Sequence, residues 1–311
     1  MRRSAIIIGI LAVVSACDKA KQPGDDAPPP PSFDVASKPP LVFQAFGNRD
    51  STRLVPIAAI VDGQLKPIEL PPADWRQLDS MYFGAGTEYP LFRDGQVTGT
   101  VKITRRMWER DSEPLYELPG CRDVRPMAAV TLTTSVPLDP VFEFLVLSSA
   151  HPASGNNRTP PADLAATARS MALVALKSQQ LDTADIDTAS FSARALHTST
   201  GGKPTILASQ VDPNAGDVGP GAGHTTSFLV LADDDGSGYK PSYTHIAIGE
   251  ARTVEFQRLL DHLDVTGDGT EEVFLESWRY GSDNDLVVLV RANGRWHEQL
   301  RVKQQWCVRK R

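Results

Sequence analysis

The chain has 311 residues, of which 41% are hydrophobic, and its 32 basic and 38 acidic side chains give a formal net charge of −6. This length supports one large domain or two smaller ones. The acidic balance, with no basic block except the tail Arg309-Lys310-Arg311, argues against nucleic acid as a partner.

The first 17 residues have the three parts of an export signal. Arg2 and Arg3 give a positive start, an apolar run covers residues 5–14, and small residues precede Cys17. At about 1.5 Å per residue the run is about 15 Å long, half of a ~30 Å hydrocarbon core, so it is too short to span a bilayer. The combination is typical of a secretory signal segment. No later apolar run approaches the length of a membrane span.

The end of this segment, Val14-Ser15-Ala16-Cys17, resembles the lipobox of bacterial lipoproteins. The resemblance implies cleavage before Cys17, a diacylglyceryl thioether on its sulfur and an acyl group such as palmitate on the new N-terminus. Two or more acyl chains hold a protein stably on a bilayer, so we expect a lipid-anchored protein that faces the periplasm or the exterior. The alternative is an ordinary secretory signal that happens to contain a cysteine. Asp18 resembles the inner-membrane retention signal of enteric lipoproteins, and the choice of membrane stays open.

The other two cysteines fit an oxidising compartment. Removal of residues 1–16 takes away two arginines, which changes the formal charge to −8, and leaves Cys121 and Cys307 as an even pair beside Cys17. We expect Cys121 and Cys307 to form a disulfide. Chain entropy gives such a long loop a stabilisation of at most about 5 kcal/mol. Two unrelated thiols are the alternative.

The chain is expected to have three parts. Residues 1–16 form the signal peptide, residues 17–40 form the lipidated cysteine and a disordered tether, and residues 41–311 form a β-rich globular domain. The tether is rich in proline and poor in apolar side chains, so it cannot bury enough surface to order itself. The globular part can also be divided into two packed halves joined near 150–162.

From Leu41 onward, short apolar runs alternate with turn dipeptides. Asp-Gly and Asn-Gly pairs supply the positive φ angles that tight hairpins need, so their recurrence predicts antiparallel sheet. The runs show no fixed period, which leaves an irregular propeller or stacked sheets. We expect a mainly β fold with one or two helices. The turn pairs are Asp62-Gly63, Asp94-Gly95, Asp235-Gly236 and Asn293-Gly294, and the expected strands are 55–60, 65–70, 89–92, 97–103, 128–133, 142–147, 191–197, 205–210, 228–231 and 286–290.

The better-defined of the two helices is expected to follow Thr159. Thr159 can cap its start, prolines 160 and 161 suit its first turn, and Asp163 complements the helix dipole. Apolar residues then recur at helical spacing, which predicts a face packed against the core. A second, shorter helix is expected around Ala73 to Phe83.

The sharpest motif is an acidic loop that leads into the strand-like run 273–275. Oxygen ligands at every second residue, with a glycine that permits a sharp turn, suit a hard cation such as Ca²⁺. Three carboxylates, a hydroxyl and a backbone carbonyl would supply these ligands. They are Asp264, Thr266, Asp268, Thr270 and Glu272.

This loop is similar to the calcium loops of FG-GAP and related repeats, in which ligands occupy positions 1, 3, 5, 7 and 9 of a strand-connecting turn. Position 3 is usually Asp or Asn in those loops, and Thr266 stands there in this chain. The loop resembles an EF-hand less, because the twelfth position is Leu275. The alternative is a glycine-rich acidic hairpin turn that binds no ion.

Catalytic motifs are scarce. The G-x-S-x-G, H-E-x-x-H and P-loop spacings are absent from the sequence. The acidic segment 233–238 is expected to be a solvated turn, and the glycine-rich segment 216–223 precedes a strand, so no helix N-terminus is available there for an anion. His224 and His262 lie beside the glycine-rich segment and the acidic loop, which makes them the two histidines to examine.

These features favour a non-enzymatic envelope module that binds the bilayer through acylated Cys17 and presents β hairpins to an envelope protein or a cell-wall component. A structural lipoprotein without a specific ligand is a variant of this hypothesis. The alternative is a surface-anchored hydrolase whose site is assembled from distant residues near His224 or His262. The sequence identifies no catalytic residue for it.

Overall fold

The computed structural model describes residues 33–48, 51–107, 127–149, 159–181, 186, 190–198, 202–211, 224–251, 253–279 and 284–304. All of them belong to one compact unit, Pro31–Arg311. The fold is mainly β, with antiparallel sheets and two α-helices, as predicted. Cys17, Cys121 and Cys307 lie outside the described residues, so the lipidation and the disulfide stay predictions. No helix in the described part is long and apolar enough to cross a membrane.

The elements follow one another from a short 3₁₀ turn near the N-terminal end of the described chain. They are η1 (Val35–Ser37), β1 (Leu41–Asn48), β2 (Ser51–Val61), β3 (Gln64–Pro67), α1 (Pro72–Tyr82), β4 (Glu88–Arg93), β5 (Gln96–Arg105), β6 (Ala128–Thr134), β7 (Phe142–Leu147), α2 (Leu164–Ser178), β8 (Phe191–Leu196), β9 (Thr205–Gln210), β10 (His224–Asp234), β11 (Tyr239–Glu250), β12 (Phe256–Leu263), β13 (Glu272–Trp278), β14 (Asn284–Ala292) and β15 (Arg295–Gln304).

The first layer is a barrel-like sheet. Its strands run in the order β1-β7-β4-β5-β6-β2, and pairing of β1 with β2 closes the sheet, while β3 extends β2 at one end. Successive side chains of a strand point to opposite faces, so Phe43 of β1 faces the interior and its neighbour Val42 faces the next layer. Helix α1 contributes Leu78 and Tyr82 to the interior.

The packed part of the chain begins before the predicted boundary at residue 41. Phe33 and Val35 are buried in the same core as the interior of the barrel-like sheet. The hydroxyl of Tyr82 donates a hydrogen bond to the backbone oxygen of Pro39. Residues 33–40, which were expected to belong to the tether, therefore pack against α1 and the first sheet.

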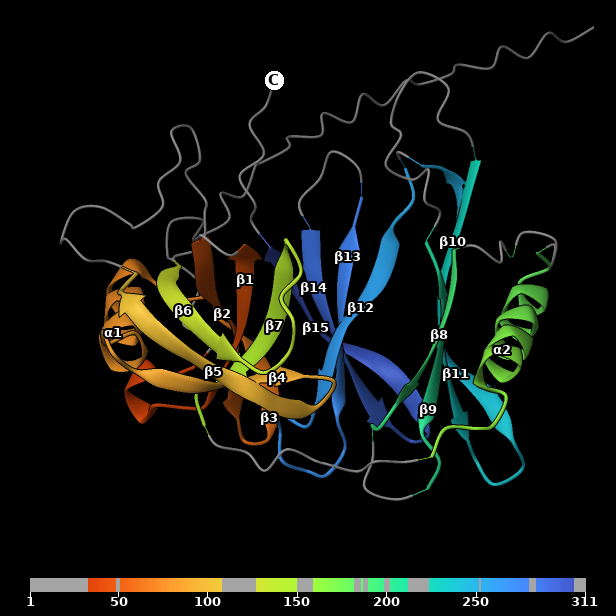
Figure 1. The fold of residues 1–311 in the computed structure, drawn as a ribbon, viewed down its shortest axis with the longest axis horizontal. Helices are drawn as coiled ribbons and strands as arrows, with labels where there is room; N and C mark the ends of the chain where they lie inside the picture. The colour runs from red at the N-terminus through yellow and green to blue at the C-terminus, as the bar shows by residue number, and fades with distance from the viewer. Residues whose placement is uncertain are drawn as a thin grey trace, which may run out of the picture. The chain divides into compact units, whose positions relative to one another are not determined.

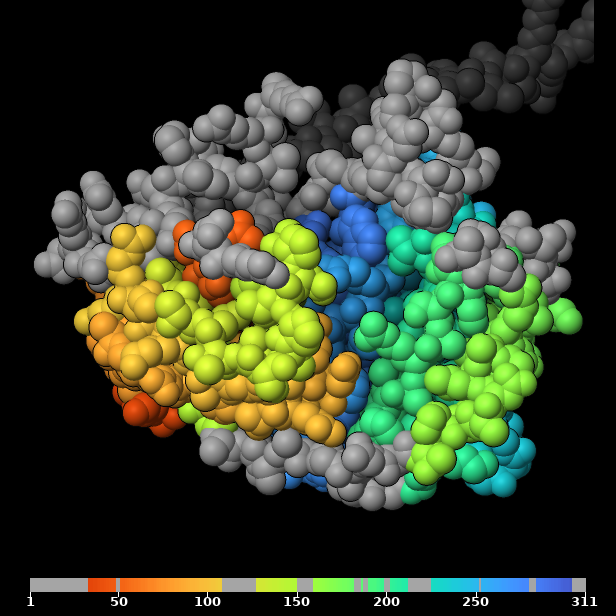
Figure 2. Space-filling model, viewed as in Figure 1, coloured from red at the N-terminus to blue at the C-terminus, as the bar shows by residue number. Residues whose placement is uncertain are grey.

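The second layer, β12 to β15, is buried on both faces. Phe274 packs toward the barrel-like sheet, whereas its neighbours Val273 and Leu275 pack toward β8 to β11. Figure 1 shows β12–β15 between the barrel-like sheet on the left and β8–β11 on the right. In Figure 2 the middle layer is visible as a blue band between the other two. Of the two arrangements left open by the sequence, the described residues form stacked sheets.

The third layer, β8 to β11, is covered on its outer face by α2 (Figure 1). Ala168, Ala172 and Leu176 of α2 pack against this sheet, which confirms the predicted apolar face. The predicted cap is wrong: Asp163, whose Oδ1 accepts a hydrogen bond from the Ala166 N–H at 3.2 Å, caps the helix instead of Thr159. A carboxylate directly before the first turn both accepts an N–H and complements the dipole, so a second cap four residues earlier is not needed.

Three of the four predicted hairpin turns have the backbone that their sequences predict. Asp62, Asp94 and Asn293 have φ angles of 52°, 50° and 53°, and each is followed by a glycine with positive φ. Two consecutive positive φ angles match the right-handed twist of the flanking strands. These turns connect β2 to β3, β4 to β5 and β14 to β15, and the second of them reaches the candidate site.

Candidate functional site

The acidic loop connects β12 to β13 and is closed by its own carboxylates. Asp264 Oδ1 accepts a hydrogen bond from the Gly267 N–H at 2.7 Å, and its Oδ2 accepts one from the Gly269 N–H at 2.9 Å. Glu272 Oε2 accepts one from the Val265 N–H at 2.9 Å. The first and last predicted ligands are therefore both turned into the loop.

Burial disfavours the ionised form of the Glu272 carboxylate. Its side chain is 4% exposed, and burial raises its pKa to about 7. The Val265 N–H and the hydroxyl of Thr266, which donates to Oε1 at 2.8 Å, lower the pKa, while the charge of Asp264 raises it further. A buried carboxylate beside a second one is stabilised by an added cation or by a proton.

The other two predicted ligands are arranged differently. Asp268 is exposed, and its Oδ1 accepts a hydrogen bond from the Thr270 N–H at 2.7 Å. Among the described residues, the three carboxylates of Asp264, Asp268 and Glu272 are not a group whose oxygens all lie within 4.8 Å of one another. The loop is closed by its own hydrogen bonds, and calcium at this loop stays a prediction.

We expect Ca²⁺ to raise the melting temperature of the processed chain, since binding to the folded state alone stabilises it. At about 100-fold excess over Kd the gain is about 2.7 kcal/mol, or roughly 5–10 °C for a chain of this size. In Asp268→Ala, which changes an exposed side chain, this shift is expected to shrink. Melting curves with Ca²⁺ and with a chelator measure it. Four identical curves would favour the turn without an ion.

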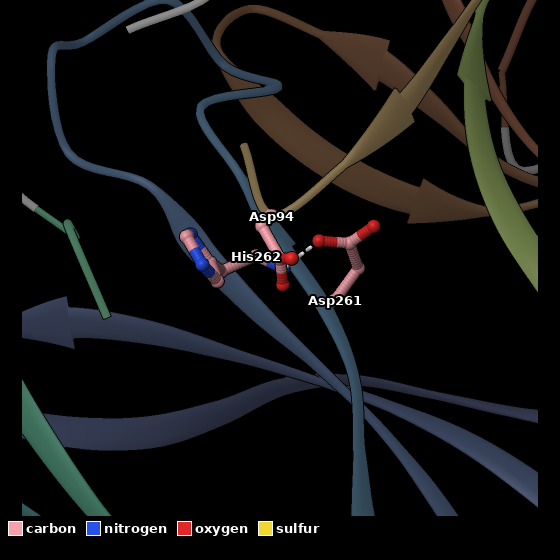
Figure 3. Close-up of side chains that lie close together, drawn as sticks. All are labelled: Asp94, Asp261 and His262. Carbon is pink, nitrogen blue, oxygen red and sulfur yellow. Dashed lines mark hydrogen bonds between the residues drawn. The ribbon is translucent and has the colours of Figure 1, made fainter. Parts of the chain in front are cut away.

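A second group of side chains lies beside the loop, where two layers meet. Asp94 is at the tip of the β4–β5 hairpin, and Asp261 and His262 are on β12. One potential ligand atom from each lies within 4.8 Å of the others. Figure 3 shows Asp94 between Asp261 and His262. We call these three residues the junction cluster. Of the three, the sequence had drawn attention to His262 alone.

The hairpin tip can approach β12 closely because Gly95 has no side chain. A Cβ at Gly95 would lie 2.7 Å from Oε1 of Glu271, the residue that precedes β13. Glu271 is itself fixed by its backbone, whose N–H donates to the Thr198 oxygen at 2.8 Å. The junction therefore brings together residues of all three layers.

His262 and Glu271 form a buried pair. Nδ1 of His262 is hydrogen-bonded to Oε2 of Glu271, and the side chains are 2% and 1% exposed. Burial by itself would lower the pKa of His262, but the hydrogen bond to Glu271 and the charges of Glu271, Asp261 and Asp94 raise it overall. The pair thus favours an imidazole that keeps its proton on Nδ1.

Asp261 is the least satisfied member of the junction cluster. A β-bulge on β12 between Leu259 and Asp261 changes the alternation, so that Leu260 to Leu263 are all buried. Oδ1 of Asp261 accepts a hydrogen bond from the His262 N–H at 2.8 Å, while Oδ2 is buried without a hydrogen-bond partner among the described residues. Burial raises its pKa to about 6, and the charge of Asp94 adds to the shift.

The segment 233–238 is not wholly a solvated turn, as had been expected. Asp234 and Asp235 are paired with Lys203 and Lys240 at the surface. Asp233, however, is 8% exposed and accepts hydrogen bonds from three side chains of two layers. Its donors are the hydroxyl of Thr205, the hydroxyl of Ser242 at 2.7 Å and the indole N–H of Trp296 at 2.9 Å.

The side chain of His224 and residues 216–223 lie outside the described part of the chain. No protein-family model, curated protein or solved structure matches this chain. The function is therefore inferred from the sequence signals and from the geometry of the described residues.

Proposed function

We propose that this chain is a lipid-anchored protein of the bacterial cell envelope whose β-rich part is a non-enzymatic binding or structural module. The lipobox-like segment that ends at Cys17 supports the location. The observation that carries the non-enzymatic role is the enclosure of the polar groups described above. His262, Glu271 and Asp233 are bonded to partners inside the layer interfaces, where a substrate does not reach them.

The partners of such a module are the bilayer, through acylated Cys17, and an envelope protein or cell-wall component. The stacked layers suit this role because they hold the hairpin turns on a rigid support. Exposed turns such as Asp62-Gly63 and Asn293-Gly294 project from closed, well-paired strands. Loops on a rigid scaffold are where binding residues are commonly found.

The second candidate is a surface-anchored hydrolase, and the paired His262 and Glu271 favour it, since a histidine held by a carboxylate is the arrangement of many general bases. A general base must reach the proton that it removes. With 2% of its side chain exposed, His262 does not meet that condition in this structure. Hydrolysis of a simple ester by the purified chain, lost in His262→Gln, would favour the hydrolase.

The anchor is tested by labelling cells with radioactive palmitate. The native chain is expected to take up label and to sediment with membranes, because acyl chains partition into the bilayer. Cys17→Ser is expected to lose the label and to remain as unprocessed precursor. Cys121→Ser is the matched control and should keep the label. Label retained on Cys17→Ser, or native precursor found in the cytosol with its leader intact, would overturn the proposal.

A further inference from the structure

We propose that the tip of the β4–β5 hairpin is a pH-sensitive contact between the first two layers, held against β12 more firmly when Asp261 is protonated than when it is ionised. The tip carries Asp94 and Gly95, and Asp261 lies on β12. One carboxylate oxygen of Asp94 lies within 4.8 Å of one of Asp261. Two acids of different layers therefore meet where the layers are in contact.

The carboxylate of Asp261 is enclosed with little compensation for a negative charge. Its side chain is 2% exposed, and its Oδ2 has no hydrogen-bond partner among the described residues. In Figure 3 the oxygen bonded to the His262 N–H faces Asp94, and the other oxygen points away from it. An ionised carboxylate is far more expensive to bury than a neutral carboxyl group. A proton on Asp261 therefore removes an unfavourable charge, and no other ligand is needed.

The first layer brings two charges of opposite sign to Asp261. The charge of Arg93 lowers the pKa of Asp261, and that of Asp94 raises it. The guanidinium of Arg93 also donates to the backbone oxygen of Glu143 on β7. The carboxylate of Glu143 is paired with Arg258 at 2.7 Å, so this acid of β7 is already compensated.

The second layer brings His262, whose charge also lowers the pKa of Asp261. Nδ1 of His262 is hydrogen-bonded to Glu271, so any positive charge on the imidazole is shared with that carboxylate. On the neighbouring strand the residue opposite Asp261 is Phe274, and β10 faces β12 with apolar side chains. Burial outweighs the two cations and raises the pKa of Asp261 to about 6.

The hairpin tip covers the paired His262 and Glu271 as well as Asp261. A Cβ at Gly95 would lie 2.7 Å from Oε1 of Glu271, so the tip rests directly on this side chain. Movement of the tip away from β12 would admit water to all three groups. Water solvates an ionised carboxylate, so the ionised form of Asp261 favours the open tip and the protonated form favours the closed one.

The direction of the pH dependence follows from the raised pKa. In the closed arrangement Asp261 titrates near 6, whereas its ordinary value is 3.8. Between these two pH values the closed arrangement binds more protons than the open one, so closing becomes more favourable as the pH falls through this window. Above the window Asp261 is ionised in both arrangements, and the tip is held least firmly.

Hydrogen exchange of the processed full-length chain, followed by mass spectrometry at about pH 5 and about pH 7.5, tests the proposal. Protection of the hairpin-tip amides is expressed relative to an unstructured peptide at the same pH, which removes the intrinsic pH dependence of exchange. The native chain is expected to lose protection about tenfold from the lower to the higher pH, since only the closed tip keeps a proton on Asp261. Asp261→Asn, which is neutral throughout, should show equal protection at both.

Asp94→Asn should show less than the native change, because it removes a charge that opposes ionised Asp261. Asparagine is favoured before a glycine at positive φ, so this exposed substitution keeps the turn and decides the question even if Asp261→Asn fails to fold. Asp62→Asn is the matched control: Asp62 has a φ of 52° before a glycine in another hairpin and should leave the native change intact. Equal protection of the native tip at both pH values would overturn the proposal. An undiminished change in Asp261→Asn or Asp94→Asn would also overturn it and assign the effect to another acid such as Glu272.

Discussion

Replacement of Asp233 by alanine is expected to lower the free energy of unfolding by about 3–5 kcal/mol, the range found when one partner of a buried charged network is removed. The carboxylate joins β10 to the middle layer through the indole of Trp296 and to its own sheet through Thr205 and Ser242. Its removal takes the acceptor from the buried indole N–H of Trp296 and the ion-pair partner from Arg291, whereas Thr205 and Ser242 each keep one other hydrogen-bond partner. Each such group costs the free energy of its lost hydration.

Denaturant unfolding of the processed chain measures this effect. Asp235→Ala is the matched control, because Asp235 lies in the same turn but is half exposed and pairs with Lys240 at the surface. Surface ion pairs contribute little to stability, so the control should unfold at nearly the native midpoint. Equal midpoints for Asp233→Ala and Asp235→Ala would show that the network does not hold the two layers together.

Truncation of either of two adjacent residues in β13 should lower the free energy of unfolding substantially, because the two side chains are buried on opposite faces of the middle layer. Phe274 and Leu275 are both fully buried, but they pack toward different neighbours. We expect Phe274→Ala to cost about 3–5 kcal/mol and Leu275→Ala about 2–5 kcal/mol, since each leaves a cavity in a packed core. In a sheet with one solvated face, only one of two neighbouring residues would be costly.

The same unfolding measurement serves here. Val97→Ala in β5 provides a comparison, because this side chain is 52% exposed and its truncation should change stability by about 0.5 kcal/mol or less. If either Phe274→Ala or Leu275→Ala behaved like Val97→Ala, the middle layer would not be enclosed by the other two.

Local signals predicted most of the strands. The pairs Asp62-Gly63, Asp94-Gly95 and Asn293-Gly294 identify their hairpins because the turn conformation depends on those two residues alone. Strands β1, β11, β12 and β15 are not among the predicted ranges, and two of them show why. β12 carries Arg258, Asp261 and His262, and its bulge interrupts the alternation, so its pattern does not indicate a strand. β11 is an edge strand of mostly half-buried side chains, which gives an equally weak pattern.

The acidic loop and the junction cluster differ in whether the local sequence could identify them. The acidic loop could be identified from spacing, because Asp264 and Glu272 are held by backbone groups within nine residues of chain. The junction cluster could not. In the sequence, Asp94 is recognisable only as a residue of a hairpin turn. It comes close to Asp261 because the barrel-like sheet packs against β12. Likewise, Asp233 resembles any acid of a surface turn until Trp296 of another sheet is placed against it.

Taken alone, the amino-acid sequence determined the mainly β class, three of the hairpin turns and the approximate position of both helices. All of these depend on residues within a few positions of one another, whose propensities act before any packing. The closure of the first sheet, the double burial of the middle layer and the meeting of Asp94 with Asp261 and His262 were decided by tertiary structure. The hydrophobic effect is non-directional. An apolar pattern therefore predicts which side chains are buried but not which distant strand will cover them.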